Sequence, residues 1–131
     1  MKTYKGFIIN LPDKGIFVFG SNTEGRHAGG AALMAVERFG AIHGEPSGIQ
    51  GQSYAIPTVK AHIEKLSIGA IQAHVQEFLD FARANPDMEF YLTPIGTGIA
   101  GFNIDEMAML FREGTTLDNL IFPEEFVTYL E

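Results

Sequence analysis

Short, unbroken apolar runs alternate along this chain with longer stretches of helical periodicity. An apolar run of about four to eight residues between glycines or prolines is typical of a strand that is buried on both faces. Such runs predict strands at residues 16–19, 53–56, 90–95 and 120–122. Pro57 is expected to stop the second of these strands, because proline cannot donate a ladder hydrogen bond.

Three other segments carry apolar residues at spacings of three and four positions, which places those residues on one face of a helix. The predicted helices span residues 29–39, 68–82 and 104–111. Gly40 fits the end of the first helix, and Pro86 lies just beyond the second. Asn103 is the predicted N-cap of the third helix. Residues 41–51 are rich in glycine and are expected to form a long loop.

Strands that alternate with helices imply a mostly parallel sheet between layers of helices. In such folds, ligands bind at the carboxyl ends of the strands. The chain has 131 residues and shows no internal repeat, low-complexity tract or long linker. We therefore expect a single domain that spans residues 1–131.

Composition and charge narrow the possible partners. Nine basic and 16 acidic residues give a formal net charge of −7, which argues against sequence-independent binding of a nucleic-acid backbone. A small anion is still compatible, because backbone amides bind phosphate without any net positive charge. The chain has no cysteine, and the first apolar run, Phe7-Ile8-Ile9, is too short for a signal peptide or a membrane span. A cytoplasmic location with no membrane contact is expected.

A glycine-rich segment follows the first predicted strand. It begins with Gly20-Ser21-Asn22 and ends at Gly29-Gly30, where the first helix opens. Glycines permit close approach of the backbone to a ligand, and the free amides of a helix N-terminus attract an anion. The segment is neither a P-loop nor a dinucleotide-binding fingerprint, because the required spacings are missing.

Several side chains of this segment are candidates for direct chemistry. The Asn22 amide can donate to a ligand hydroxyl while it accepts from a backbone amide, or it can simply stabilise a turn. Arg26 and His27 can contact a phosphate or transfer a proton, and Glu24 can act as a partner. Solvated loop residues are the alternative for all three.

A second glycine-rich segment, residues 96–101, follows the third predicted strand. Successive amides in such a loop form a concave nest for an anion, and the Thr97 hydroxyl can add one more donor. Two loops of this kind at one edge of a sheet favour a diphosphate, and therefore a phosphate-bearing nucleotide.

Together, these segments resemble the macrodomain family. Phe17-Val18-Phe19-Gly20-Ser21-Asn22, with the later Gly29-Gly30-Ala31-Ala32, is similar to the family's strand, asparagine and glycine-rich loop before its first helix. Residues 95–102 are similar to the family's second loop. Tyr54-Ala55-Ile56-Pro57-Thr58 lies where macrodomains carry a strand and a turn that borders the ligand.

The resemblance implies a three-layer α/β/α sandwich with a mixed, mostly parallel sheet and an ADP-ribose site between the two loops. Asn22 would face the distal ribose, and Phe102 would border that sugar or pack in the core. No cofactor and no metal are implied. The candidate catalytic residues are Asn22, Lys60 and His27. The predicted ligand-binding residues are Gly20, Ser21, Asn22, Gly29, Gly30, Ala31, Pro57, Thr58, Gly96, Thr97, Gly98, Ile99, Ala100, Gly101 and Phe102.

The chain is closest to the macrodomain branch of terminal ADP-ribose protein glycohydrolases, yet it departs from the hydrolytic patterns. That branch has an acidic residue after the second loop, where this chain has Ala100, and a lysine at the position of Val59 or Lys60. Another hydrolytic branch has an aspartate where this chain has Ala31-Ala32. These departures weaken a catalytic role and leave the binding surface intact.

Three hypotheses follow from the sequence. The first is binding of ADP-ribose or an ADP-ribosylated substrate, with metal-independent hydrolysis of the ADP-ribosyl linkage. The second is a sensor or sponge that binds without turnover. The third is a phosphoester-processing enzyme on a different α/β fold that uses His27 and Glu24. Lys60 and His62 are candidates for a nucleophile or proton carrier or are solvated, and Gln50 contacts the nucleotide or caps backbone groups.

Overall fold

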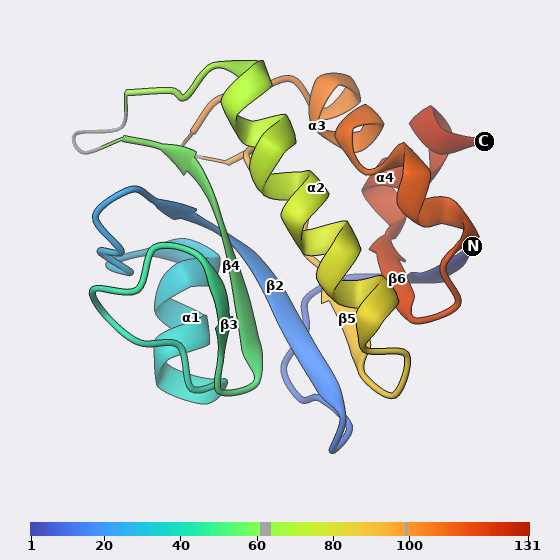
Figure 1. The fold of residues 1–131 in the computed structure, drawn as a ribbon, viewed down its shortest axis with the longest axis horizontal. Coiled ribbons are helices and arrows are strands. Elements are labelled where there is room, and N and C mark those ends of the chain that lie inside the picture. Colours follow the sequence, from blue (N-terminus) through green and yellow to red (C-terminus); the bar gives the residue numbers. More distant parts are fainter. Residues whose placement is uncertain (61–63, 99) are drawn as a thin grey trace.

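The computed structural model describes residues 1–60, 64–98 and 100–131. Its strands are β1 (Lys2–Tyr4), β2 (Gly15–Asn22), β3 (Gly48–Gln50), β4 (Ser53–Val59), β5 (Glu89–Leu92) and β6 (Leu120–Pro123). They form a six-stranded sheet in the order β1-β6-β5-β2-β4-β3 (Figure 1). Every neighbouring pair is parallel except β3 with β4. The prediction of a mixed, mostly parallel sheet is confirmed.

The helices are α1 (Gly30–Arg38), α2 (Ile68–Ala84), α3 (Ile104–Leu110) and α4 (Glu124–Leu130), with a 3₁₀ helix, η2 (Arg112–Thr116), after α3. Helix α1 covers one face of the sheet, and α2, α3 and α4 cover the other, which gives three layers (Figure 1). Within the described ranges, no helix combines the length and the apolar character needed to cross a membrane.

Strand β2 connects the two hydrophobic cores, because its side chains alternate between the faces of the sheet. Phe17 and Phe19 pack with Ala35 of α1, while Ile16 and Val18 pack in the core below α2. All four side chains are buried. This explains why an unbroken apolar run predicted the strand.

Tyr54, at the start of β4, extends the aromatic part of the larger core. Its ring contacts those of Phe78 and Phe81 on α2, with centroids 5.0 and 5.3 Å away. Burial, with a smaller contribution from the Glu77 carboxylate, raises the pKa of Tyr54 to about 12. The phenol therefore stays neutral at physiological pH.

The predicted helices are confirmed as α1, α2 and α3, with ends that differ by a few residues. Asn103 occupies the N-cap position of α3, but its side chain donates to Glu106 Oε1 instead of capping a backbone amide. The strand at residues 90–95 ends earlier than predicted, at Leu92. Strands β1 and β3, helix α4 and η2 were not predicted from the sequence.

The prediction that Pro57 stops β4 is wrong, since the strand continues to Val59. Strand β3 pairs with β4 only between Ser53 and Ala55, so Pro57 has no ladder neighbour on that side. Proline is tolerated at such an edge because its missing N–H leaves no hydrogen bond unmade. On its other side, Pro57 lies opposite Ser21 of β2.

The chain leaves α1 and returns to the sheet through a close contact between Gly40 and Gly51. Gly51 has a φ of +59°, and a Cβ built on it would lie 2.8 Å from the Gly40 Cα. Phe39 O accepts hydrogen bonds from Gln52 N at 2.8 Å and from the Ser53 hydroxyl at 2.9 Å. These contacts hold together the two ends of the segment 41–50, which comprises the loop at residues 41–47 and β3.

Substitution Gly51→Ala should therefore destabilise the protein. A left-handed conformation costs an alanine roughly 1–2 kcal/mol, and displacement of Gly40 adds to that penalty. We expect the free energy of unfolding in urea to fall by about 2 kcal/mol or more. Gly69→Ala is the control, because a Cβ at Gly69 meets open space within α2; equal effects of the two substitutions would contradict the close-contact explanation.

Candidate functional site

The two glycine-rich loops follow neighbouring strands at the carboxyl edge of the sheet. Strand β2 lies between β5 and β4, and all three strands are parallel. The chain runs from β2 to α1 on one face of the sheet, and from β5 to α3 on the opposite face (Figure 1). In open α/β sheets, the region between the loops of two such strands is where ligands bind, and this region is called the crevice below.

Gly20 lies where β2 meets the start of the second loop and the end of β4. A Cβ built on Gly20 would be 3.3 Å from Ile95 Cγ2, 3.6 Å from Thr58 Oγ1 and 3.8 Å from Gly96 N. The structure thus brings together residues from three segments that are far apart in the sequence. Gly20 itself lies within β2 and not in a loop, because β2 extends to Asn22.

The Asn22 side chain organises the first loop. Its Oδ1 accepts from the backbone amides of Glu24 at 3.1 Å and Arg26 at 3.0 Å, and its Nδ2 donates to Arg26 O at 2.8 Å. This is the turn-stabilising role that the sequence left open as an alternative. One N–H of the amide has no partner within the described residues, so Asn22 can still donate to a ligand.

The loop at residues 41–47 supports the first loop from outside. Gly44 N donates to Gly25 O at 2.9 Å, and the Ser21 hydroxyl donates to Pro46 O. A Cβ on Gly25 would come within 2.6 Å of Glu45 N, so only glycine allows this approach. The first loop is therefore held between β2 and a second layer of backbone.

His27 lies beneath this layer and is completely buried. Its Nε2 is 3.1 Å from Glu45 O, and its ring packs edge-on against Phe19 and stacks on His43. A ring with no exposed surface cannot reach a ligand in the crevice. His27 is thus a core residue in this structure, which argues against its proposed roles in phosphate contact and proton transfer.

Gln50 also has a structural role. Its side chain is buried, accepts from Ile42 N at 2.8 Å and donates to Glu45 O at 3.0 Å. The backbone-capping alternative therefore describes this residue, and direct contact with a nucleotide does not. Glu24 and Arg26 are exposed and pair with each other at 3.7 Å.

The start of α1 is exposed and has no side-chain cap. Gly29 is the N-cap, with an extended φ of −160° and no side-chain hydrogen bond, and Gly30 to Leu33 include no acidic residue. Gly29, Gly30 and Ala31 are all exposed, and a Cβ at Gly29 or Gly30 would meet open space. An exposed helix N-terminus without a carboxylate is suited to an anion.

The second loop satisfies part of its own backbone. Thr97 N lies 3.4 Å from Pro94 O, Gly101 N donates to Gly98 O at 3.0 Å, and Phe102 N donates to Gly96 O at 2.8 Å. The Thr97 hydroxyl donates to Pro94 O at 2.7 Å, so in this structure it is not a free donor for a ligand. Gly98 is exposed, and a Cβ there would meet open space. Ala100 is buried, and Ile99 lies outside the described residues.

A short hairpin after β4 forms the third side of the site. Pro57 and Thr58 are buried at the end of β4, where Thr58 Oγ1 lies 3.5 Å from Ser21 O. Lys60 is exposed and lies 3.9 Å from Glu64. His62 falls outside the described residues.

Lys65 is a residue of this site that the sequence did not reveal. Its Nζ donates to Gly101 O at 2.9 Å and lies 4.9 Å from the centroid of the Phe102 ring. The antiparallel bridge between Val59 and Lys65 returns the chain to the end of β4 and so brings the lysine to the second loop. The signal in the sequence is a basic residue two positions before Ser67, the N-cap of α2. The place of Lys65 in the structure, however, depends on the unpredicted hairpin.

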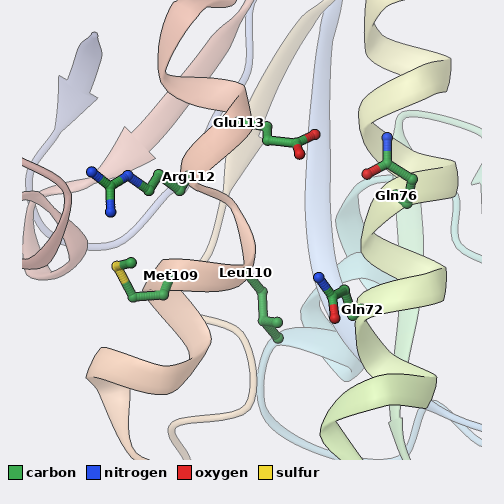
Figure 2. A pocket seen from close by; sticks show the side chains of 6 residues that line it. All are labelled: Gln72, Gln76, Met109, Leu110, Arg112 and Glu113. Atoms are coloured by element: carbon green, nitrogen blue, oxygen red, sulfur yellow. The ribbon is translucent and has the colours of Figure 1, made fainter.

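Two shallow pockets lie elsewhere on the molecule. One, of about 370 Å³, is a groove between α2 and the α3–η2 segment, into which Leu110 and Glu113 point (Figure 2). The other, of about 360 Å³, lies near the end of α2. None of the predicted site residues lines either pocket. In the described part of the chain, no cluster of three potential metal ligands occurs.

Comparison with known proteins identifies the fold. No family model and no curated protein matches the sequence. The macrodomain of Mycobacterium tuberculosis DarG is similar in structure, with a TM-score of 0.66 at 18% sequence identity over 94% of this chain and 97% of that one. A protein of unknown function from Bacteroides thetaiotaomicron matches with a TM-score of 0.61 at 13% identity, over 92% and 97% of the two chains. The resemblance to macrodomains is thus confirmed for the fold, while the glycohydrolase branch stays a prediction.

The hydrogen bonds of Asn22 lead to a prediction about the first loop. Asn22→Ala removes the acceptor for two backbone amides, so amide hydrogen exchange at Glu24 and Arg26 should accelerate. The free energy of unfolding should fall by about 1 kcal/mol, because these bonds are exposed. Asn22→Asp keeps the acceptor and should preserve the protection of both amides. Unchanged exchange in the alanine variant would show that the loop holds its shape without this side chain.

Proposed function

We propose that residues 1–131 form a single domain that binds ADP-ribose, or a related ADP-ribosyl nucleotide, in the crevice between the two glycine-rich loops. The observation that carries this proposal is that β2, the start of the second loop and the end of β4 meet around Gly20. The first loop continues from this end of β2, so backbone groups of both loops would be available to one ligand. The macrodomain-like fold supports the choice of ADP-ribose.

Each side of the crevice suits one part of such a ligand. The exposed amides at the start of α1 would bind the diphosphate, helped by the positive end of the helix dipole. From the second loop, the amide of Gly98 would bind the same diphosphate, since Gly98 is exposed and a Cβ built on it meets open space. The spare N–H of Asn22 would donate to a ribose hydroxyl, and Phe102, which is partly buried, would border that sugar.

The partner would be free ADP-ribose or an ADP-ribosylated substrate. The formal charge of −7 opposes binding of a nucleic-acid backbone, so recognition would depend on the local amides and not on a basic surface. The proposal needs no cofactor and no metal ion, because backbone N–H groups alone can stabilise the negative charge of a diphosphate.

A second candidate function is hydrolysis of an ADP-ribosyl linkage in the same crevice. Two lysines, Lys60 and Lys65, lie on the hairpin that borders the site, and an amine there could take part in cleavage. Against this stand Ala31, Ala32 and Ala100, which provide no carboxylate. A non-catalytic sensor or sponge is therefore the alternative that the side chains favour.

Binding can be tested by blocking each loop separately. Calorimetry with ADP-ribose should detect binding to the wild-type protein, and Gly29→Val or Gly98→Val should weaken it by about tenfold or more, since each new side chain enters open space in the crevice. Gly69→Val is the control, because it adds the same side chain in open space at the start of α2. Thermal unfolding should confirm that the two loop variants fold. An absence of wild-type binding at millimolar ligand would disprove the proposed function.

Hydrolysis needs a separate measurement. If the domain is a sensor, an ADP-ribosylated protein should bind without release of free ADP-ribose, as followed by chromatography. Release that is lost in both Lys60→Ala and Asn22→Ala would establish the catalytic alternative. A phosphoesterase that depends on His27 is not expected, because His27→Ala would open a cavity in the core and lower stability before it changed any chemistry.

A further inference from the structure

Lys65 is the cation whose surroundings differ from those of the other charged residues at the site. Arg26 and Lys60 each lie within 4 Å of a carboxylate, at 3.7 and 3.9 Å. Lys65 forms no such ion pair with any described residue, and residues 61–63 and 99 contain no acid. Its partners are instead a neutral carbonyl, Gly101 O, and the face of the Phe102 ring.

The two partners lie at the end of the second loop, where Gly101 is the last residue and Phe102 follows it. Gly101 has a φ of +74°, and a Cβ built there would contact Lys65 Cε at 3.6 Å. Phe102 packs against the larger core on one side, while its N–H closes the loop onto Gly96 O. Lys65 thus contacts the loop at the point where the chain turns toward α3.

We infer that Lys65 is a latch that holds the second glycine-rich loop in its binding conformation and keeps Phe102 at the edge of the crevice. The inference rests on the proposed function for its effect on ligand affinity. Lys65 acts as a positioning residue, since its contacts are with the loop. The latch connects the hairpin after β4 to the loop after β5, two segments that border the crevice from different sides.

The expected loss of ligand affinity depends on the fraction of molecules whose second loop has the binding conformation. The charge-assisted hydrogen bond and the cation–π contact of Lys65 stabilise this conformation of the loop. If their loss lowers the population of the binding conformation to about one tenth, the apparent dissociation constant rises about tenfold. The fold itself should not change, because Lys65 is exposed and belongs to neither core.

The first experiment needs no ligand. Lys65→Met should accelerate amide hydrogen exchange at Gly101 and Phe102, the two amides that close the loop. Thr93 N, which donates to Val18 O in the sheet, serves as an internal reference and should not change. Unchanged exchange at Gly101 and Phe102 would overturn the latch, whether or not the protein binds ADP-ribose.

The second experiment measures affinity for ADP-ribose by calorimetry. Lys65→Met should raise the dissociation constant about tenfold, while Lys65→Arg, which keeps the charge and stacks on an aromatic ring, should stay within about threefold of wild type. Lys5→Met is the control for the loss of one positive charge, because Lys5 pairs with Glu124 away from the crevice. Equal affinities of the Lys65→Met variant and the wild type would overturn the inference. Equal losses in the Lys65→Met and Lys65→Arg variants would overturn it too.

A double-mutant cycle tests the contact with the ring. Phe102→Leu removes the aromatic face and keeps an apolar side chain against the core. If Lys65 acts partly through this ring, the combined variant should lose less affinity than the product of the two single losses. Fully independent effects would exclude the ring from the latch. A wild-type protein that does not bind ADP-ribose would disprove the proposed function alone, because the exchange experiment still decides the latch.

Discussion

The structure depends on the complete enclosure of β2 in the centre of the sheet. Its side chains are buried on both faces, and its backbone pairs with β4 on one side and β5 on the other. A strand in this position has no freedom to shift, because a slip of one residue would exchange its two buried faces. Val18 O even accepts both the N–H and the hydroxyl of Thr93, so the chain that leaves β5 is tied to β2 as well. The origins of both glycine-rich loops are thereby fixed by the sheet itself.

Around this strand, the polar side chains of the site mainly satisfy the protein's own backbone. Asn22, Gln50 and Thr97 all bond to main-chain groups, and His27 is enclosed behind the first loop. Gly29, Gly30 and Gly98, in contrast, are exposed, and α1 begins without a side-chain cap. Side chains thus give the first loop its shape, and under the proposed function the main chain would make the contacts with the ligand.

The sequence predicted those parts of the fold that local physical rules determine. The apolar runs of β2, β4 and β6 and the helical periodicity of α2 are local signals of burial, and they identified these elements. The short edge strand β1 was missed because Lys2 to Tyr4 show no apolar alternation and are held only by pairing with β6. Pro57 was misjudged because its tolerance depends on the short length of β3.

The same distinction applies to the site. The loop positions were predictable, since the carboxyl ends of parallel strands meet at one edge. The burial of His27 was not, because it requires residues 41–47 to fold over the first loop. Lys65 was missed because only the hairpin after β4 brings it beside Gly101. Non-local contacts of this kind have no counterpart in residue spacing.

Three alanines lie beside the glycines of the two loops, namely Ala31, Ala32 and Ala100. Their surroundings determine where a carboxylate could be introduced. Ala31 is exposed at the start of α1, where a carboxylate would also interact favourably with the helix dipole. Ala100 is buried, so a larger side chain there would have to displace its neighbours. The two loops therefore differ in how easily they could accommodate an acidic side chain. Evolution or protein design could introduce an acid on the α1 side with a single substitution, and the scaffold would not need to be rebuilt.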